Sequence, residues 1–368
     1  MQHNNKTMGE VGGFFEFPED TLDDVSGSVL HHLISGFGKR ELQSHFIRDG
    51  RQAITSVLMS RKQSIRTRTC YLPAYLCYSM LLPFTEQRLR VKFYSHHHPL
   101  RPEIDPGMKD SLVFLNDAFG VPALSHREMQ ELGENGNIVI LDTSHSILDP
   151  SRFVSHGSDF FIIASLRKIF PVPDGGVVFS SDPGFHPDLI SPSGWEPMLE
   201  AMFLKKFYLA SKSRHDALFI KERFLELNQK YNETKNHIPE TLSAIPDISL
   251  HILNRLSFSM IAAKRKGNLS HVNRSINERY WLFQPDDSTC PYFATILLPD
   301  GEMRDHFRSR CIQRALYSPI LWPIPPEVPE SFTYEHDLSR RLLCIPIDQR
   351  YSPQSYEGAR DLFETIKE

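Results

Sequence analysis

Several features that mark large functional classes are missing from this sequence. Its five cysteines are an odd number and form no C-x-x-C pair, so we expect neither a disulfide framework nor a zinc site, and a reducing cytoplasm fits best. Neither G-x-x-x-x-G-K-S/T nor G-x-G-x-x-G occurs, so the sequence gives no support for a loop of the kind that binds nucleotide phosphates.

Long apolar runs and a strong charge bias are absent as well. No run approaches the roughly 18 apolar residues that a membrane-spanning helix needs, and the polar start MQHNNKTMGEVGG lacks the hydrophobic part of a secretory signal. The formal net charge of −4 gives no electrostatic reason to expect nucleic acid or an anionic membrane as partner. The histidines at 96–98 are predicted to lie in a solvated loop rather than to bind a metal. We therefore expect a cytoplasmic protein without nucleic-acid, membrane or metal partners.

What is present is an ordinary globular composition with a clear order of segments. The 368 residues, 40% hydrophobic and 23% charged, suffice for one large α/β unit and a smaller one. From about residue 40 to 180, short apolar runs alternate with helix-like stretches, which predicts βαβ units and a mainly parallel sheet covered on both faces. The predicted strands are 69–75, 89–95, 111–120, 137–144, 159–165 and 175–181.

The second half of the chain has a different pattern. After a Pro/Ser-rich break at 181–194, the segment 195–233 predicts one or two long helices and 248–276 another helix. From residue 291 onward the pattern predicts a β-α-β-α order. We therefore predict a large domain over 1–245 and a smaller C-terminal α/β domain over 246–368.

Polar side chains follow the predicted strands of the large domain. Asp142 closes one strand, Asp117 follows another, and Ser165 and Lys168 follow a third. In an open α/β sheet, ligands bind outside the carboxyl ends of the strands. We therefore expect these four residues to lie near one ligand site.

A phosphate site is predicted at the start of a helix in the same domain. Gly50, Arg51 and Gln52 begin the helical stretch 50–62. The free N–H groups and the dipole at such a helix start favour a phosphate. One site could therefore hold a phosphate, an amine nucleophile and a buried carboxylate.

Pyridoxal phosphate needs this combination of groups. Its aldehyde condenses with a lysine amine, its ring nitrogen needs a carboxylate, and its phosphate needs N–H and hydroxyl donors. Lys168 would supply the amine, Asp142 the carboxylate, and Ser165 with the helix start at 50–52 the phosphate contacts. Each of these residues alone is typical of an ordinary turn or cap; the prediction depends on their order, with Lys168 following Asp142 by 26 residues.

With these residues in place, the chain resembles the fold-type-I pyridoxal-phosphate enzymes, and most closely the DegT/StrS-type sugar aminotransferases. DGRQAI is similar to the family's phosphate turn, LDTSHS to its D-x-A-H/Q motif, and GSDFFIIASLRKIFPVPDGGVV to its lysine segment. Weaker similarities are GGFFEF to an opening strand, YLPAYLCYSMLLPF to the segment after a proline, and LYSPILWPIP with LLCIPIDQRYS to the small domain. The spacing of serine and lysine in SLRK is shorter than in the family.

The resemblance implies a fold, an activity and further site residues. It implies a mainly parallel seven-stranded sheet in the large domain, and an aminotransferase that uses Lys168 to move an amino group from an amino acid, usually glutamate, to a keto sugar, usually nucleotide-linked. His145 would contact the cofactor ring, and Tyr75 is one choice for the aromatic residue that stacks on it. Asp117 and Arg350 are weaker choices for substrate contacts, since bidentate anion binding suits arginine.

The resemblance also implies a homodimer with its active site at the subunit interface. The segment 246–270 is similar to the part that reaches across in relatives, so that Ser249 or Arg255 would touch the neighbour's cofactor; a helix charged only on its solvent face is the alternative.

Two other functions remain open at this point. One is a non-catalytic relative that binds pyridoxal phosphate or a sugar nucleotide, which the unusual SLRK spacing keeps in view. The other is a different pyridoxal-phosphate enzyme of the same fold, such as a cysteine desulfurase or an aldolase; no cysteine stands in an obviously mobile, exposed context.

Overall fold

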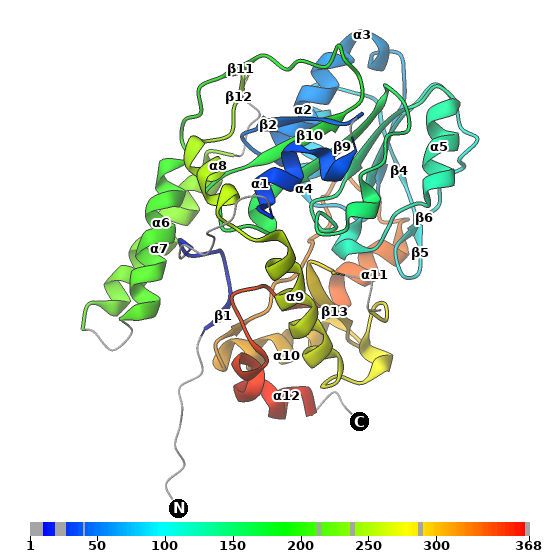
Figure 1. Cartoon of the computed structure of the whole chain (residues 1–368). Helices are drawn as coiled ribbons and strands as arrows, with labels where there is room; N and C mark the ends of the chain where they lie inside the picture. Colours follow the sequence, from blue (N-terminus) through cyan, green and yellow to red (C-terminus); the bar gives the residue numbers. More distant parts are fainter. Residues whose placement is uncertain are drawn as a thin grey trace, which may run out of the picture.

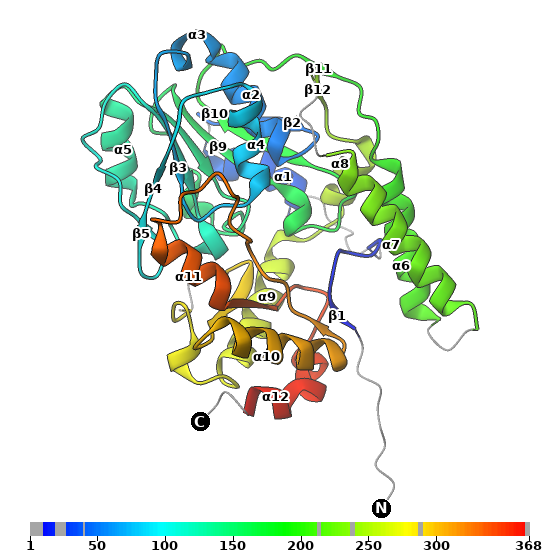
Figure 2. The ribbon, with the colours of Figure 1, turned by 180° about the vertical axis from the view of Figure 1, so that it is seen from behind.

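The computed structural model describes residues 10–18, 27–39, 41–211, 215–235, 240–285 and 290–364. A large sheet with helices on both sides forms the upper part in Figure 1, and a smaller α/β unit lies below it. A hairpin of two long helices extends from one side, as the view from behind in Figure 2 also shows.

The large sheet has seven strands and is mainly parallel, as predicted. Its spatial order is β2-β10-β9-β8-β7-β3-β4, and β10 alone runs antiparallel to its neighbours. The strands are β2 (Gln43–Ile47), β3 (Cys70–Pro73), β4 (Val91–Tyr94), β7 (Leu112–Asn116), β8 (Ile138–Asp142), β9 (Phe160–Ser165) and β10 (Gly176–Ser180).

Side-chain alternation along the central strands supplies two apolar cores. Successive side chains of a strand point to opposite faces, so that Val139 and Leu141 join one core while Ile138 and Ile140 join the other. Helices α1 (Val29–Ile34), α5 (His126–Glu134) and α8 (Asp247–Asn254) supply buried residues to the first core, and α2 (Gly50–Ser60) and α4 (Tyr78–Glu86) to the second. Both faces are therefore covered, which explains the near-continuous hydrophobicity of the strands.

The long helical segments differ partly from the prediction. The stretch 195–233 forms two helices, α6 (Glu196–Ala210) and α7 (Ala217–Glu233), which pack against each other. The stretch 248–276, predicted as one helix, is broken into α8 and α9 (Phe258–Asn273). The Ser257 hydroxyl accepts the Met260 N–H and caps α9, which explains the break, since serine favours a helix start.

The C-terminal unit contains one helix that was not predicted. Strands β13 (Phe293–Leu297) and β15 (Leu342–Pro346) pair antiparallel, with α10 (Gly301–Gln313), the unpredicted α11 (Thr333–Arg341) and the terminal α12 (Arg360–Glu364) around them. The chain's own start joins this unit, because β1 (Val11–Gly12) pairs in parallel with β14 (Leu316–Tyr317). A side chain at Gly12 would stand 2.5 Å from the Tyr317 carbonyl oxygen, so the pairing requires glycine there.

The predicted division at residue 245/246 stays a prediction, and the packing runs across it. Helix α8 and the start of α9, through Ile261, belong to a core of the large sheet, whereas Leu269 and the following apolar residues of α9 pack with the C-terminal unit.

Within the described ranges, no helix is long and apolar enough to cross a membrane, and no group of three or more metal-ligating side chains occurs. The predicted solvated loop at 96–98 is wrong for His96. This residue is buried, and its Nδ1 lies 3.0 Å from Glu335 Oε1 of α11.

Gly176 should be the most sensitive glycine of the large sheet. A methyl group there would stand 2.5 Å from the Asp49 carbonyl carbon, so Gly176→Ala should lower the free energy of unfolding by about 1–3 kcal/mol. Gly267→Ala in α9 is the matched control, because nothing lies within 4 Å of its added methyl; it should stabilise by about 0.5–1 kcal/mol. Denaturant unfolding of both variants checks this, and a Gly176→Ala protein as stable as the parent would contradict it.

Candidate active site

A cavity at the carboxyl edge of the parallel strands brings most of the predicted site residues together. Its volume is about 90 Å³. It is lined at the ends of β8 and β9, at the starts of α2 and α4, and beyond α7 by Asp49, Gly50, Arg51, Ile54, Ser79, Met80, Asp142, Ser144, Ser165, Arg167, Lys168 and Lys235. The amine, the carboxylate, the hydroxyl and the helix start predicted from the sequence therefore share one cavity.

A larger cavity of about 490 Å³ adjoins the first one, because Arg167 and Lys168 line both. Its walls come from His145, the chain start at 12–15 and the C-terminal unit, and they carry many aromatic side chains. Among these are Phe14, Phe15, Tyr292, Phe293, Tyr317 and Trp322. Lys168 thus stands between a small polar cavity and a large, mainly apolar one.

His145 lies beside Lys168, and the backbone fixes its tautomer. The Phe119 N–H donates to His145 Nδ1 at 3.0 Å, so a neutral ring carries its proton on Nε2. That nitrogen lies 3.4 Å from Lys168 Nζ. Burial, followed by the charges of Lys168 and Arg265, lowers the pKa of His145 well below its ordinary value. The imidazole is therefore a neutral donor that points its N–H toward the lysine amine.

Aromatic packing holds the His145 ring in place. Tyr292 stacks on it with ring centres 4.4 Å apart, and Trp322 lies nearly parallel to it at 5.4 Å. Arg265 of α9, which is fully buried, donates to the carbonyls of Pro291, at 3.2 Å, and Tyr292. Helix α9 thereby positions the stack that confines the histidine.

Asp142 has one oxygen in use and one available. Its Oδ1 accepts the Ser144 N–H at 2.8 Å, while Oδ2 has no hydrogen-bond partner among the described residues. The residue is 6% exposed and lines the cavity. A buried carboxylate with a spare oxygen suits a protonated ring nitrogen, because burial strengthens a charge-assisted hydrogen bond.

Ser165 and Gly50 form the opposite wall of the small cavity. The Ser165 N–H donates to Ser144 Oγ at 2.8 Å, and Ser165 Oγ has no partner in the described part of the chain. A side chain at Gly50 would come within 3.1 Å of Ser165 Cβ. Glycine therefore lets the helix start approach the end of β9.

Gln52 does not take the predicted role. Its N–H donates to Asp49 Oδ1 at 3.0 Å, its side-chain oxygen accepts the Ser243 N–H at 2.7 Å, and it does not line the cavity. Because the Gln52 N–H already donates to the capping residue Asp49, it is not available to a ligand.

Tyr75 is not placed to stack on a cofactor ring. It is fully buried, its hydroxyl donates to the Leu321 carbonyl, and it lines neither cavity. Met80 lines the small cavity and Trp322 the large one. The sequence did not predict either residue as part of the site, because their places in the cavity walls depend on tertiary packing that no local pattern encodes.

Asp117 is committed to internal contacts rather than to a substrate. Both of its oxygens are bonded to the Arg152 guanidinium, at 2.8 and 3.1 Å, and they also accept from the Ser146 hydroxyl and the Ala123 N–H. The pair is almost fully buried. A carboxylate with four donors has no capacity left for a ligand.

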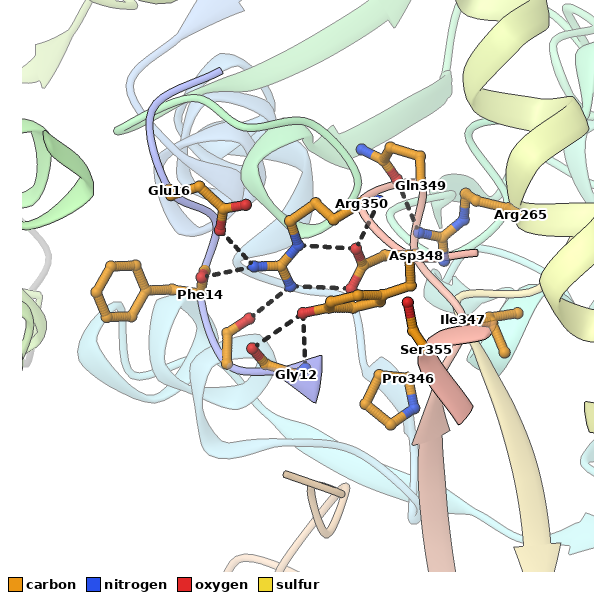
Figure 3. Close-up of polar contacts among 12 residues, drawn as sticks. Gly12, Phe14, Glu16, Arg265, Pro346, Ile347, Asp348, Gln349, Arg350 and Ser355 are labelled. Atoms are coloured by element: carbon orange, nitrogen blue, oxygen red, sulfur yellow. Dashed lines mark hydrogen bonds and ion pairs between the residues drawn. The ribbon is translucent and has the colours of Figure 1, made fainter. Parts of the chain in front are cut away.

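Arg350, predicted to contact a substrate, lines the large cavity, but its donors are engaged within the chain, as Figure 3 shows. Its five N–H groups are all used, two by Asp348 at 2.8 and 2.9 Å, one by Glu16 at 3.0 Å, and two by the carbonyls of Gly13 and Phe14 at 3.0 Å. An arginine has five such donors and no more. Arg350 therefore fastens the chain start to the C-terminal unit.

The predicted cross-subunit residues receive different outcomes. Ser249 is fully buried and donates to the Asp174 carbonyl at 2.6 Å, so it is engaged within its own chain. Arg255 ends α8, and its role toward a neighbour stays a prediction.

Comparisons with known proteins support the fold. No protein-family profile and no curated protein sequence matches the chain. Among solved structures, a DegT/DnrJ/EryC1/StrS aminotransferase from Brucella abortus is similar over 95% of this chain and 92% of its own, with 13% identity and a TM-score of 0.63. The sugar aminotransferase CalS13 from Micromonospora echinospora matches over 97% and 99%, with 10% identity and a TM-score of 0.56.

The PLP form of the Streptococcus pneumoniae sugar aminotransferase Spr1654 is similar over 97% of this chain and 93% of its own, with 9% identity and a TM-score of 0.60. The chain shares the fold of these aminotransferases. The fold implied by the sequence is therefore confirmed.

The geometry around His145 predicts a neutral ring across the physiological range. In ¹⁵N-histidine NMR spectra, the His145 signal is identified as the one that is missing from the His145→Gln variant. In the wild type this signal should show the Nε2–H tautomer and should not titrate between about pH 5 and 8. Because the unfolded chain has a histidine pKa of about 6.5, it takes up the proton first as the pH falls. The stability supplied by the neutral ring is therefore complete above about pH 6.5 and is lost below it. A titration near 6.5, or an Nδ1–H signal, would contradict the assignment.

Proposed function

We propose that this chain is a pyridoxal-phosphate-dependent aminotransferase that moves an amino group from an amino acid, glutamate being the expected donor, to a keto sugar. The observation that carries the proposal is the single cavity at the sheet edge that Lys168, Asp142 and Ser165 line together. The fold shared with sugar aminotransferases supports it. The five free thiols are consistent with a cytoplasmic location.

The residues of the small cavity fit the cofactor in chemical type. When bound, pyridoxal phosphate supplies an aldehyde that bonds to an amine and a ring that withdraws electrons. Asp142 Oδ2 would accept the ring N–H and keep that nitrogen protonated, while Ser165 Oγ would donate to the phosphate.

Lys168 has two tasks in this proposal. Its amine is the group that could bond to the aldehyde, and the same amine would carry a proton to and from the carbon that bears the substrate's amino group. The neighbouring His145 Nε2–H can donate to a neutral amine but not to an ammonium group. The histidine Nε2, 3.4 Å from Lys168 Nζ, therefore stands where it can orient the amine in its neutral form.

The large cavity is the proposed site of the sugar acceptor. Its volume of about 490 Å³ is greater than a free amino acid would fill, and its aromatic walls suit the apolar faces of a sugar or base. Arg308 Nε donates to the Ser318 carbonyl at 3.1 Å, and its two terminal nitrogens have no partner within the described ranges. We propose that these nitrogens bind an anionic part of a nucleotide-linked acceptor.

A homodimer is proposed from the surface of the α6–α7 hairpin. The side chains of Leu218 and Phe219 are 67% and 70% exposed, and Phe203, Phe207 and Leu225 are each at least 45% exposed. Helix α6 carries apolar residues all around, and the hairpin stands out from the large domain. Large exposed apolar surfaces of this kind mark protein interfaces.

Replacing Lys168 tests the proposed chemistry. Borohydride reduction of protein with pyridoxal phosphate should attach the cofactor to the peptide that contains Lys168, and Lys168→Ala should abolish this product in mass spectra. Glutamate should then yield its keto acid in a single turnover, and Lys168→Ala should slow this by at least about 100-fold.

The control is Lys92→Ala, which changes an exposed lysine. It should keep both the cofactor attached at Lys168 and the wild-type rate of keto-acid formation. Equal trapping in Lys168→Ala would show that the lysine is wrong. Trapping without keto-acid formation from any amino acid would favour the non-catalytic alternative.

The hairpin surface predicts the oligomeric state. Light scattering should give twice the mass of one chain for the wild type, and Leu218→Glu with Phe219→Glu should give a single chain, because buried charges disfavour an apolar interface. Met303→Glu on α10, where the side chain is 42% exposed, is the control and should leave the dimer intact. A wild-type protein of single-chain mass would refute the proposed dimer.

A further inference from the structure

A buried ionic cluster lies beside the start of α2. Lys235 Nζ lies 2.7 Å from Asp174 Oδ1 and 3.3 Å from Asp49 Oδ2, and Arg48 Nε donates to Asp174 Oδ2 at 3.0 Å. Asp174 is fully buried, and Asp49 and Lys235 are at most 6% exposed. Burial alone would raise the pKa of Asp49, but Lys235, Arg51 and the Gln52 N–H hold it well below its ordinary value. Asp49 is therefore a carboxylate at the helix start.

Asp49 takes the donors that a helix start would offer to an anion. Its side-chain oxygen accepts the N–H of Arg51 at 2.9 Å and that of Gln52 at 3.0 Å, and its carbonyl accepts that of Ala53 at 2.9 Å. Among the described residues, only the Gly50 N–H remains without a partner in the first turn. A carboxylate at this position also repels a second anion.

Two guanidinium groups are available at the same cavity. Arg167 lines it and has no hydrogen bond or ion pair with any described residue. Its guanidinium lies 5.5 Å from the centre of the Tyr231 ring, and it stands within electrostatic range of the Asp174 and Asp49 carboxylates. Arg51 lines it too and uses one donor, which goes to the Lys235 carbonyl. An arginine stays charged in proteins and offers five donors in a fork that matches a phosphate.

The charges around the helix start leave room for a dianion. Arg48, Arg51, Arg167 and Lys235 are the cations, and Asp49 and Asp174 are the carboxylates. The three arginines alone carry one positive charge more than the two carboxylates, and a protonated Lys235 adds a second. Burial lowers the pKa of Lys235, although Asp174 and Asp49 oppose that effect.

We propose that this chain holds the cofactor phosphate mainly through the guanidinium groups of Arg51 and Arg167, and not through the N–H groups of α2. Lys235 is a positioning residue in this site, because it neutralises Asp49 and, among the described residues, makes no hydrogen bond or ion pair with Lys168 or Asp142. The inference rests on the proposed cofactor but concerns only its phosphate end. It replaces the helix-start phosphate site predicted from the sequence by a site of side-chain cations.

The phosphate contribution can be isolated by comparing pyridoxal phosphate with pyridoxal, which lacks the phosphate. The dissociation constants of both are measured by fluorescence titration, with inorganic phosphate as a competitor. The wild type should prefer pyridoxal phosphate. Arg167→Met and Arg51→Met should each reduce that preference by about 10- to 100-fold, since a charged hydrogen bond is lost.

Asp49→Asn gives the sharpest expectation. Asparagine caps a helix as well as aspartate does, so the fold should persist while the repelling charge is removed. Pyridoxal phosphate and inorganic phosphate should then bind more tightly than to the wild type, and pyridoxal should bind as before. The exposed Arg90→Met is the matched control for loss of one positive charge and should change none of these constants.

Two results would overturn the inference. One is an unchanged preference in both arginine variants; the other is weaker phosphate binding in a folded Asp49→Asn protein, which would show that Asp49 supports the site. Borohydride trapping in the same samples keeps the tests separate. If the cofactor is trapped at Lys168 but the arginine variants keep the wild-type preference for pyridoxal phosphate over pyridoxal, only the arginine site is refuted. If the wild type shows that preference and the arginine variants lose it, but no cofactor is trapped at Lys168, only the proposed chemistry is refuted.

Discussion

The burial of three charges, Asp49, Asp174 and Lys235, is the constraint on which the small cavity depends. A charge removed from water without a partner costs several kcal/mol, so the elements that carry these side chains must meet for the chain to fold. They are the start of α2, the residues before β10 and the segment just after α7. Gly176 permits the contact, because any side chain there would clash with the backbone of Asp49. Once these elements meet, the helix start stands against Ser165, and the small cavity has its wall.

The large cavity depends on a second set of internal charges, which belong to the C-terminal unit. Arg350 binds the chain start, and Arg265 binds the backbone at Pro291 and Tyr292. The first contact brings the segment 12–15 to the cavity wall, and the second places Tyr292 on the His145 ring. Segments distant in the sequence therefore form the mainly apolar wall of the large cavity that Lys168 lines.

The sequence was sufficient for six of the seven strands of the sheet and for the polar residues at their ends, because both follow from local rules. The strand β2, with mostly half-buried or exposed side chains, was not among the predicted strands. Period-two alternation between two buried faces determines the strands, and the carboxyl ends of parallel strands bring Asp142, Ser165 and Lys168 to one edge. Asp117 also ends a strand at this edge, yet it is neutralised by Arg152. Residue type and strand position predict where a charged side chain lies. They do not predict whether a residue from elsewhere in the chain pairs with it, as Arg152 does with Asp117. Lys235 and Trp322 were missed for the same reason.

Asp49 shows how stability and ligand binding compete for the same donors. As a helix cap it contributes on the order of 1 kcal/mol, and as a partner of Lys235 it compensates a buried ammonium group. Both contributions belong to the fold itself, and both weaken the helix start as an anion site. A chain with such a cap can bind a phosphate tightly only if other cations are already held at the cavity. Arg51 and Arg167 meet this condition because their free donors are not used by the fold. The residues that maintain the shape of the site, Asp49, Asp174 and Lys235, are therefore different from those that bind the phosphate in this proposal, Arg51 and Arg167. A substitution in one set leaves the residues of the other set in place.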